Sequence, residues 1–216
     1  AGEDKDNANW VGSYLLTNEE KENLKNITEA FEDVCVVLNV SNIIDLKWID
    51  EEQFKGHIKS VIIVWQGGME GGNAVAEALS GKATPSGKLP DTVAYDIEDY
   101  PSNDNFGNEL TNLYKEDIYV GYRYFETFAP EKVQFEFGFG LSYTTFDIET
   151  VSADADDEKV TLEVKVTNTG DKFSGKEVVQ VYYEAPQGAL GQPARQLCAY
   201  EKTENLAPGQ SQTLKI

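Results

Sequence analysis

One segment of the chain combines a solid apolar run with two pairs of glycines, and this combination limits the folds that it can adopt. Residues 61–65 (VIIVW) contain no charged residue, and the sequence QGGMEGG follows at once, with Glu70 between the glycine pairs. The four glycines are Gly67, Gly68, Gly71 and Gly72. Unbroken apolar runs rich in β-branched residues are typical of strands buried on both faces. Paired glycines allow backbone conformations that a Cβ would forbid. The segment therefore predicts a buried strand that ends in a ligand-facing loop of an open α/β sheet.

Helix and strand patterns alternate in the part of the chain that precedes this loop. Thr17 and Glu20 stand at the spacing of a capping box, and apolar residues at helical spacing continue the helix to about Phe31. Residues 34–38 (VCVVL) form a short apolar run, which predicts a strand buried on both faces. Residues 60–65 predict the next buried strand.

Two further helices are expected, one before and one after this second strand. Asp50 is placed to cap a short helix that runs to Ile58. Residues 73–80 predict another helix, which Gly81 ends. Helices and strands that alternate with short links indicate an α/β layer with parallel strands.

The middle of the chain has a different character. Residues 91–132 are polar, rich in Tyr and Phe, and lack a clear period, so we expect a long ordered connection. Phe135, Phe137 and Phe139 then occupy alternate positions before a turn-prone GLS sequence.

From Phe146 onward the pattern is all-β. Residues 160–166 alternate strictly, so that Val160, Leu162, Val164 and Val166 share one face of a strand. The remaining segments are a turn at 168–171, a strand at 177–183, a turn at 207–210 and an acidic hairpin loop at 154–158. This order is similar to an immunoglobulin-like or fibronectin type III β-sandwich. Such domains run to about 100 residues and only about 70 follow Phe146, so we expect closing strands to be missing or replaced.

The charge balance excludes several classes of partner. Lys and Arg total 18 against 38 Asp and Glu, which gives a formal net charge of −20. This charge opposes binding to the phosphate backbone of nucleic acids and to anionic membrane surfaces. No apolar run approaches the roughly 20 residues that a membrane span needs. We expect neither a nucleic-acid nor a membrane partner.

The cysteines and the histidine give no sign of a metal or a disulfide. Cys35 and Cys198 lie far apart in apolar surroundings and are interpreted as small buried hydrophobic residues rather than a pair. Unpaired cysteines favour a reducing compartment such as the cytoplasm. His57 is the only histidine, so we expect no zinc site, and we expect no other cofactor. His57 is interpreted as a charge in the last turn of a helix.

Carboxylates are the remaining candidates for chemistry. The GGMEGG sequence lacks the spacing of a dinucleotide loop, SGKL lacks the upstream glycine of a P-loop, and one histidine leaves little room for a catalytic triad. Glu3 lies in a compact acidic loop, for which a charged terminus is the alternative interpretation. Glu70 is interpreted as a structural carboxylate that accepts hydrogen bonds from nearby backbone N–H groups. Trp48 and Trp65 adjoin apolar segments, and we expect both to pack in the core.

Four ordered motifs resemble one enzyme family. Residues 65–92 (WQGGMEGGNAVAEALSGKATPSGKLPDT) resemble the PGxEGGxAxAxxLxGxxNPSGKLPxT signature of glycoside hydrolase family 3, the β-glucosidases and β-xylosidases. Residues 119–125 (YVGYRYF) and 137–146 (FGFGLSYTTF) are similar to two further family segments. The tail, including residues 193–197 (PARQL), is similar to the family's fibronectin-like domain.

The resemblance implies a catalytic role for one carboxylate. In that family a (β/α)8 barrel supplies an aspartate nucleophile, and an α/β sandwich domain supplies the acid/base glutamate from a GEGxDR-like loop. Residues 2–7 (GEDKDN) are similar to that loop, which places the acid/base on Glu3 and the accompanying aspartate on Asp6. Asp4 stands where glycine is usual, and Asn7 where arginine is usual. The glycine loop around Glu70 then becomes one wall of the site.

The same resemblance implies a domain organisation and a set of partners. Residues 1–135 are expected to form part of an α/β sandwich domain with a long C-terminal connection, and residues 136–216 a fibronectin type III-like β-sandwich. The implied substrate is a β-linked oligosaccharide or aryl glycoside, and the implied partner is the barrel domain of the same protein. Retaining glycosidases need two carboxyl groups about 5–5.5 Å apart, so we expect the chain alone to be inactive. A non-catalytic carbohydrate-binding or scaffolding module, or a relative whose barrel has lost its nucleophile, are the alternatives.

Overall fold

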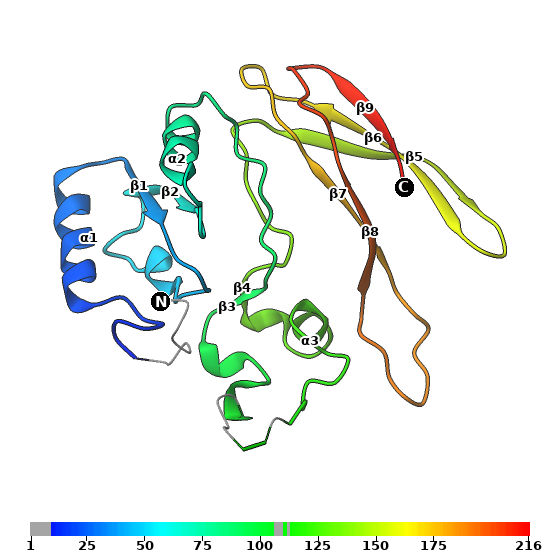
Figure 1. Cartoon of the computed structure of the whole chain (residues 1–216), viewed down its shortest axis with the longest axis horizontal. Helices are drawn as coiled ribbons and strands as arrows, with labels where there is room; N and C mark the ends of the chain where they lie inside the picture. Colours follow the sequence, from blue (N-terminus) through cyan, green and yellow to red (C-terminus); the bar gives the residue numbers. More distant parts are fainter. Residues whose placement is uncertain (1–9, 106–109, 112) are drawn as a thin grey trace. The chain divides into compact units, whose positions relative to one another are not determined.

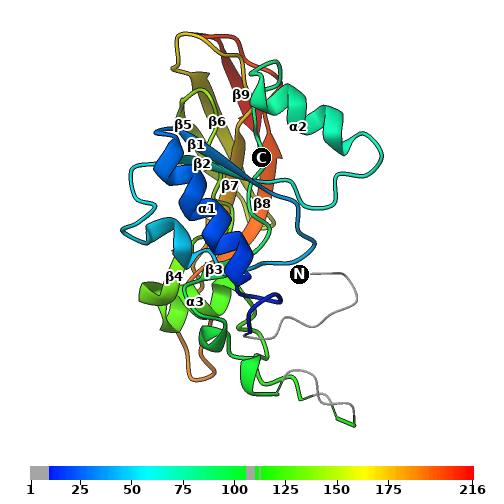
Figure 2. The same cartoon turned by 90° about the vertical axis from the view of Figure 1, so that its left-hand side faces the viewer.

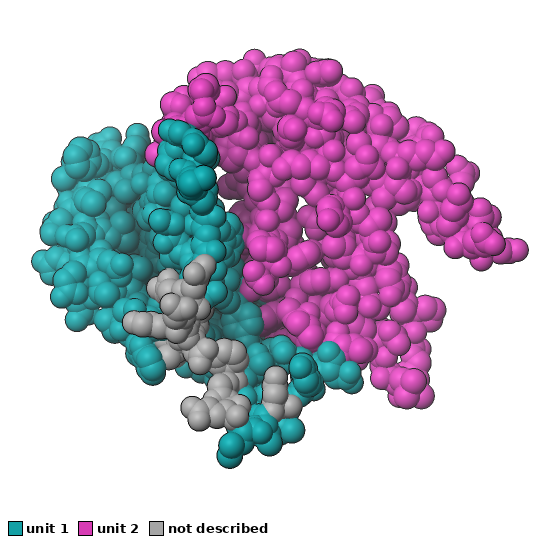
Figure 3. All heavy atoms as spheres, viewed as in Figure 1, with its two compact units in different colours: residues 1–75, 93–117, 131–134 teal, residues 76–92, 118–130, 135–216 magenta. Residues whose placement is uncertain are grey.

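The computed structural model describes residues 10–105, 110–111 and 113–216 of the 216-residue chain. Contacts divide the chain into two compact units (Figure 3). The first comprises Ala1–Val75, Val93–Asp117 and Glu131–Gln134, and the second comprises Ala76–Thr92, Ile118–Pro130 and Phe135–Ile216. In the described ranges, no helix is long and apolar enough to cross a membrane.

The first unit contains a helix beside a small parallel sheet. Helix α1 (Asn18–Ala30) begins at the predicted capping box, in which the Thr17 hydroxyl accepts from the Glu20 N–H and the Glu20 carboxylate accepts from the Thr17 N–H. Strand β1 (Val34–Leu38) pairs in parallel with β2 (Ile58–Ile63). Figures 1 and 2 both show α1 against one face of this pair. The predicted helix and both predicted strands are therefore confirmed as elements, with shifted ends, but no residue of β2 is fully buried, which contradicts the prediction of a buried strand there.

The expected burial of β1 on both faces is wrong. Val34 and Leu38 are buried, but Cys35 is exposed and Val37 is 38% exposed. Cys198 is also exposed, so both cysteines contradict the prediction that they are buried. Burial depends on neighbouring elements and not on apolar character alone, and within the described residues β2 is the only strand paired with β1.

The segment before β2 contradicts the prediction of a helix from Asp50 to Ile58. A 3₁₀ helix, η1 (Lys47–Asp50), ends at Asp50 instead of beginning there, and Ile58 is the first residue of β2. The cause is Trp48, which is 1% exposed and donates from Nε1 to the Asp45 carbonyl oxygen at 2.9 Å. Gly56 then adopts φ +84° in the turn that leads into β2. The predicted packing of Trp48 in the core is confirmed.

Two further corrections concern neighbouring residues. His57 precedes β2 and does not lie in a helix; its Nδ1 is 3.3 Å from the Phe31 carbonyl oxygen. Trp65 lies beyond the end of β2, with φ 49°, although it was predicted to end the strand. It is only partly buried, although it was predicted to pack in the core. Helix α2 (Gly71–Leu79) follows the glycine loop and confirms the predicted helix with a start two residues earlier.

The connection between residues 91 and 132 holds short elements that the sequence pattern did not reveal. They are β3 (Val93–Ala94), η2 (Ile97–Asp99), η3 (Asn103–Asn105), α3 (Tyr122–Phe128), η4 (Pro130–Lys132) and, just beyond, β4 (Val133–Phe135). Helix α3 has only seven residues, too few to show a helical period, and it starts after Gly121 at φ 59°. The expected long connection therefore contains short regular elements, of which α3 is the longest.

Antiparallel strands form most of the second unit. Strands β5 (Phe146–Ala155), β6 (Val160–Asn168) and β9 (Ser211–Lys215) pair in the order β5-β6-β9, and β7 (Val178–Tyr183) pairs with β8 (Gln196–Lys202). Their core contains Val164, Val166, Val179, Leu206 and Leu214. The predicted apolar face of β6 is confirmed at Val164 and Val166, whereas Val160 is 63% exposed near the hairpin end. An α/β part followed by a β part is thus the observed arrangement.

Asn168 contradicts its predicted place in a turn. It is the last residue of β6 and its side chain is fully buried. Its Nδ2 donates to the carbonyl oxygens of Phe173 and Leu206, and its Oδ1 accepts from the Thr144 hydroxyl and the Gly170 N–H. Buried polar groups need such partners, so the turn that follows is organised around the Asn168 amide.

Candidate functional site

Glu3, the expected acid/base, and Asp6, its accompanying aspartate, lie outside the described residues. The glycine loop, in contrast, is described in full. It is exposed from Gln66 to Glu70, and Met69 is fully exposed at the tip of the loop.

The glycines of this loop serve two different geometric requirements. A Cβ on Gly67 would lie 2.8 Å from the Gly71 Cα, so this approach of two backbone segments requires glycine. Gly68 adopts φ +63°, which a side chain would strain, and its carbonyl oxygen accepts from the Gly71 N–H at 3.2 Å. A Cβ on Gly72 would meet open space. The close backbone approach expected from the sequence is therefore confirmed at Gly67.

Glu70 lies at the start of α2 and has a structural partner there. Its carboxylate accepts a hydrogen bond from the Asn73 side-chain amide, and its carbonyl oxygen accepts from the Ala74 N–H at 3.0 Å. We expected the carboxylate to accept from backbone N–H groups; the observed partner is a side chain one helical turn further along. A carboxylate at a helix N-terminus is also stabilised by the helix dipole.

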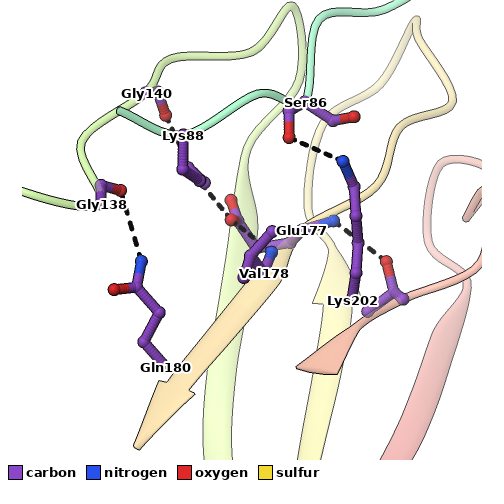
Figure 4. A network of polar contacts seen from close by, with 9 residues as sticks. Ser86, Lys88, Gly138, Gly140, Glu177, Val178, Gln180 and Lys202 are labelled. Carbon is purple, nitrogen blue, oxygen red and sulfur yellow. Dashed lines mark hydrogen bonds and ion pairs between the residues drawn. The ribbon is translucent and has the colours of Figure 1, made fainter. Parts of the chain in front are cut away.

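The second half of the same signature is held by a network of polar contacts in the second unit (Figure 4). The Lys88 ammonium donates to the Gly140 carbonyl oxygen at 2.9 Å and lies 2.8 Å from the Glu177 carboxylate. Lys202 donates from Nζ to the Ser86 carbonyl oxygen at 2.9 Å. The SGKLP sequence is thereby attached to Lys202 of β8 and to Glu177, which precedes β7. The SGKL sequence, which lacks the features of a phosphate loop, thus contributes its lysine to a structural ion pair.

The charges in this network affect one another. Burial lowers the pKa of Lys202, and the nearby ammonium groups of Lys176 and Lys88 lower it further, while Glu177 opposes them. Lys88 and Glu177 are 19% and 14% exposed, so water screens their attraction only in part. The network is therefore an anchor between segments and holds no free acid or base suited to catalysis.

No metal site is formed by the described residues. Within them, no group of three or more His, Cys, Asp or Glu side chains is placed to hold a metal ion.

Comparison with known proteins places these elements in a family. Residues 1–122 match the glycosyl hydrolase family 3 C-terminal domain, and residues 177–216 match a fibronectin type III-like domain. The "Beta-glucosidase" of Ruminococcus albus is 52% identical over all of this chain and 22% of its own length. "Beta-glucosidase A" of Butyrivibrio fibrisolvens is 48% identical, over 95% of this chain and 26% of its own length.

Solved structures give the same result. The β-glucosidase of Paenibacillus barengoltzii matches with a TM-score of 0.96 and 57% identity, over 100% of this chain and 24% of that protein. β-Glucosidase 3B of Thermotoga neapolitana, solved with glycerol, matches with a TM-score of 0.90 and 36% identity, over 98% of this chain and 30% of that protein. The chain thus spans about a quarter of the length of these relatives. The resemblance drawn from the four motifs is confirmed, and the chain belongs to glycosyl hydrolase family 3, with that family's C-terminal domain and a fibronectin type III-like domain.

Proposed function

We propose that the chain acts as part of a retaining glycoside hydrolase that cleaves terminal β-D-glucosidic bonds. The observation that carries this proposal is the 52% identity over the whole chain to a protein named a β-glucosidase. The substrate class that we propose is a β-linked glucooligosaccharide or an aryl β-glucoside. The partner is a catalytic barrel of the same protein, which supplies the nucleophile.

In this proposal the chain supplies the acid/base carboxyl group, Glu3. Glu3 donates a proton to the glycosidic oxygen as the barrel nucleophile attacks the anomeric carbon and the leaving group departs. Glu3, now a carboxylate, then removes a proton from the water that hydrolyses the glycosyl–enzyme intermediate. Each of the two steps inverts the anomeric carbon, so the product retains the β configuration.

The surroundings of Glu3 decide whether it can act as an acid near neutral pH. Burial in a closed site raises the pKa of a carboxyl group, which keeps it protonated until the leaving group needs the proton. In the proposed assembly the barrel provides that cover. Asp6 and the loop of Gly67, Gly68, Glu70, Gly71 and Gly72 are assigned to a wall of the site, with a structural and not a catalytic role.

The finer description of the fold is part of the same proposal. We assign residues 1–135 to an α/β sandwich domain with parallel strands, and residues 136–216 to a fibronectin type III-like β-sandwich. The parallel pair β1–β2 and the antiparallel pairings of β5 to β9 support this assignment.

The proposal is tested by transplanting the chain into a longer relative of known structure. The chain replaces the matching 24% of the P. barengoltzii β-glucosidase, and hydrolysis of p-nitrophenyl β-D-glucoside is measured. We expect the chimera to be active and the 216-residue chain alone to show no turnover. Turnover by the chain alone that a Glu3→Gln substitution leaves unchanged would contradict both the assignment of Glu3 and the need for a barrel.

A further inference from the structure

A hollow of about 260 Å³ lies in the second unit, where four segments meet. Helix α3 contributes Tyr122, the segment after β4 contributes Phe137, strand β7 contributes Gln180 and Tyr182, and Arg195 precedes β8. Pockets for drug-sized ligands measure roughly 300–1,000 Å³, so this hollow suits a smaller occupant.

Aromatic rings form one wall of the hollow and are held in place. Tyr122 stacks on Phe137 with ring centroids 4.8 Å apart, and Tyr182 meets the edge of Tyr122 at 5.9 Å. The Tyr122 hydroxyl accepts a hydrogen bond from the Leu197 N–H at 2.8 Å, which fixes the ring. Phe139 also lines the hollow and is 40% exposed. The wall therefore offers apolar surface without having to rearrange.

Polar groups also line the hollow and are held at fixed positions. The Tyr182 hydroxyl donates to Gln180 Oε1 at 2.6 Å, which orients the Gln180 amide. A Cβ on Gly138 would lie 2.4 Å from Gln180 Nε2, and Gly138 has φ +81°, so the amide occupies space that only glycine leaves free. These contacts hold the Gln180 side-chain amide, a planar group with both a hydrogen-bond donor and an acceptor, in the lining of the hollow.

Charged side chains complete the lining. Arg195 Nε lies 3.4 Å from Glu126 Oε2, and the two side chains are 48% and 28% exposed. Glu136 also lines the hollow and is exposed. The lining therefore offers a guanidinium as hydrogen-bond donor and carboxylates as acceptors, on side chains that solvent still reaches.

We propose that this hollow is an accessory binding site for a single pyranose ring. An apolar wall together with a small number of placed donors and acceptors in one hollow matches a sugar, whose ring face carries C–H groups and whose edge carries hydroxyls. A cation is less well suited, because Arg195 already neutralises Glu126 and its own charge repels a cation. A purely apolar ligand would bury the Arg195 guanidinium and the Glu136 carboxylate without replacing their hydrogen bonds to water.

The proposal is tested by NMR titration of the ¹⁵N-labelled 216-residue chain with methyl β-D-glucopyranoside. We expect saturable shifts at the Gly138 amide and the Gln180 side-chain amide, with a Kd on the order of 1 mM for so small a contact. Arg195→Met and Glu136→Ala are expected to weaken binding at least 10-fold each. Glu149→Ala, an exposed carboxylate of β5 outside the hollow, is the matched control and should bind as the unchanged chain does.

Three results would overturn the proposal. They are the absence of saturable shifts up to 100 mM sugar, equal affinity in the Arg195→Met, Glu136→Ala and control variants, or saturation by methylguanidinium in place of the sugar. A thermal unfolding curve for each variant shows whether a loss of binding reflects a loss of fold. The proposal rests on the proposed function only for the choice of a glucoside as the probe. Because the titration needs no hydrolysis and Glu3→Gln should not affect it, its failure is distinct from failure of the catalytic assignment.

Discussion

The ammonium of Lys88 lies 2.8 Å from the Glu177 carboxylate, and the two side chains are 19% and 14% exposed. Lys88 belongs to the SGKLP sequence, while Glu177 directly precedes β7, so the pair joins the family signature to the start of β7. The Glu177 carboxylate also accepts from the Val178 N–H at 2.7 Å. The second half of the signature, the SGKLP sequence, therefore has a structural role: it anchors its segment to the residues around β7.

The losses from removing the two members of this pair should not add. Lys88→Met leaves the Glu177 charge poorly compensated, and we expect a loss of about 1–3 kcal/mol in the free energy of unfolding. Glu177→Gln should cost a similar amount. In the double variant the combined loss should fall short of the sum by about 0.5–3 kcal/mol, measured by urea unfolding in a double-mutant cycle. Additive losses would show that the pair contributes no coupling.

The buried amide of Asn168 should be more sensitive than its exposed neighbour. Asn168→Ala leaves the carbonyl oxygens of Phe173 and Leu206 without their side-chain donor in the interior. We expect a loss of about 2–4 kcal/mol in unfolding free energy. Asn205→Ala, at an exposed position, is the control and should change it by less than about 0.5 kcal/mol. Equal effects in thermal or urea unfolding would contradict the role given to the Asn168 amide.

Two glycines of the signature loop should respond to alanine in opposite directions. Gly67→Ala places a Cβ 2.8 Å from the Gly71 Cα, so the backbone must move, and we expect a loss of about 1–3 kcal/mol. Gly72 lies inside α2 with open space around it, and alanine there should stabilise by up to about 1 kcal/mol through helix propensity. Urea midpoints of the two variants test the difference in sign, and a stabilising Gly67→Ala would contradict the close approach.

The carboxyl group of Asp45 predicts a pH dependence of stability. Burial raises the pKa of Asp45 above the ordinary value of 3.8, and the nearby charge of Asp96 adds to the shift. The hydrogen bond from the Lys47 N–H and the positive charges of Lys47 and Lys21 oppose it. Because the folded state holds the proton more tightly, this contribution to stability is full below pH 3.8 and is lost as the pH rises through the folded pKa.

Asp45→Asn removes this dependence and keeps an oxygen for the Lys47 N–H. The difference in unfolding free energy, variant minus unchanged chain, should therefore become more positive from pH 4 to pH 7. Urea unfolding at both pH values tests this, and taking the difference cancels the titration of the other carboxylates. A difference that is constant or falls with pH would contradict the raised pKa.

The sequence predicted those elements whose cause is local. The α1 capping box, the β-branched runs and the alternation in β6 follow from chain-local geometry, and the structure confirms them. It failed where a distant partner decides the outcome. Burial of Trp48 ends η1 at Asp50, and the exposure of Cys35 depends on which strands lie beside β1.

The candidate site was predictable to a different degree. The geometry of Gly67 could be inferred, because a glycine pair after a strand is informative by itself. The pairing of Lys88 with Glu177 spans 89 positions of the chain and no local pattern indicates it. The hollow at Tyr122 and Gln180 likewise gathers residues from four segments, so only the folded chain brings them together.

The role of Glu3 as acid/base is tested most directly by leaving-group dependence in the chimera with the P. barengoltzii enzyme. A Glu3→Ala variant should lose about 10²–10⁴-fold in kcat/KM on methyl β-D-glucoside or cellobiose, whose leaving groups need the proton. The loss should be far smaller on 2,4-dinitrophenyl β-D-glucoside, whose leaving group does not need it. Azide should restore its turnover and give β-glucosyl azide with retained configuration. Equal losses on both substrates with no rescue by azide, or no loss on either, would contradict the assignment of Glu3.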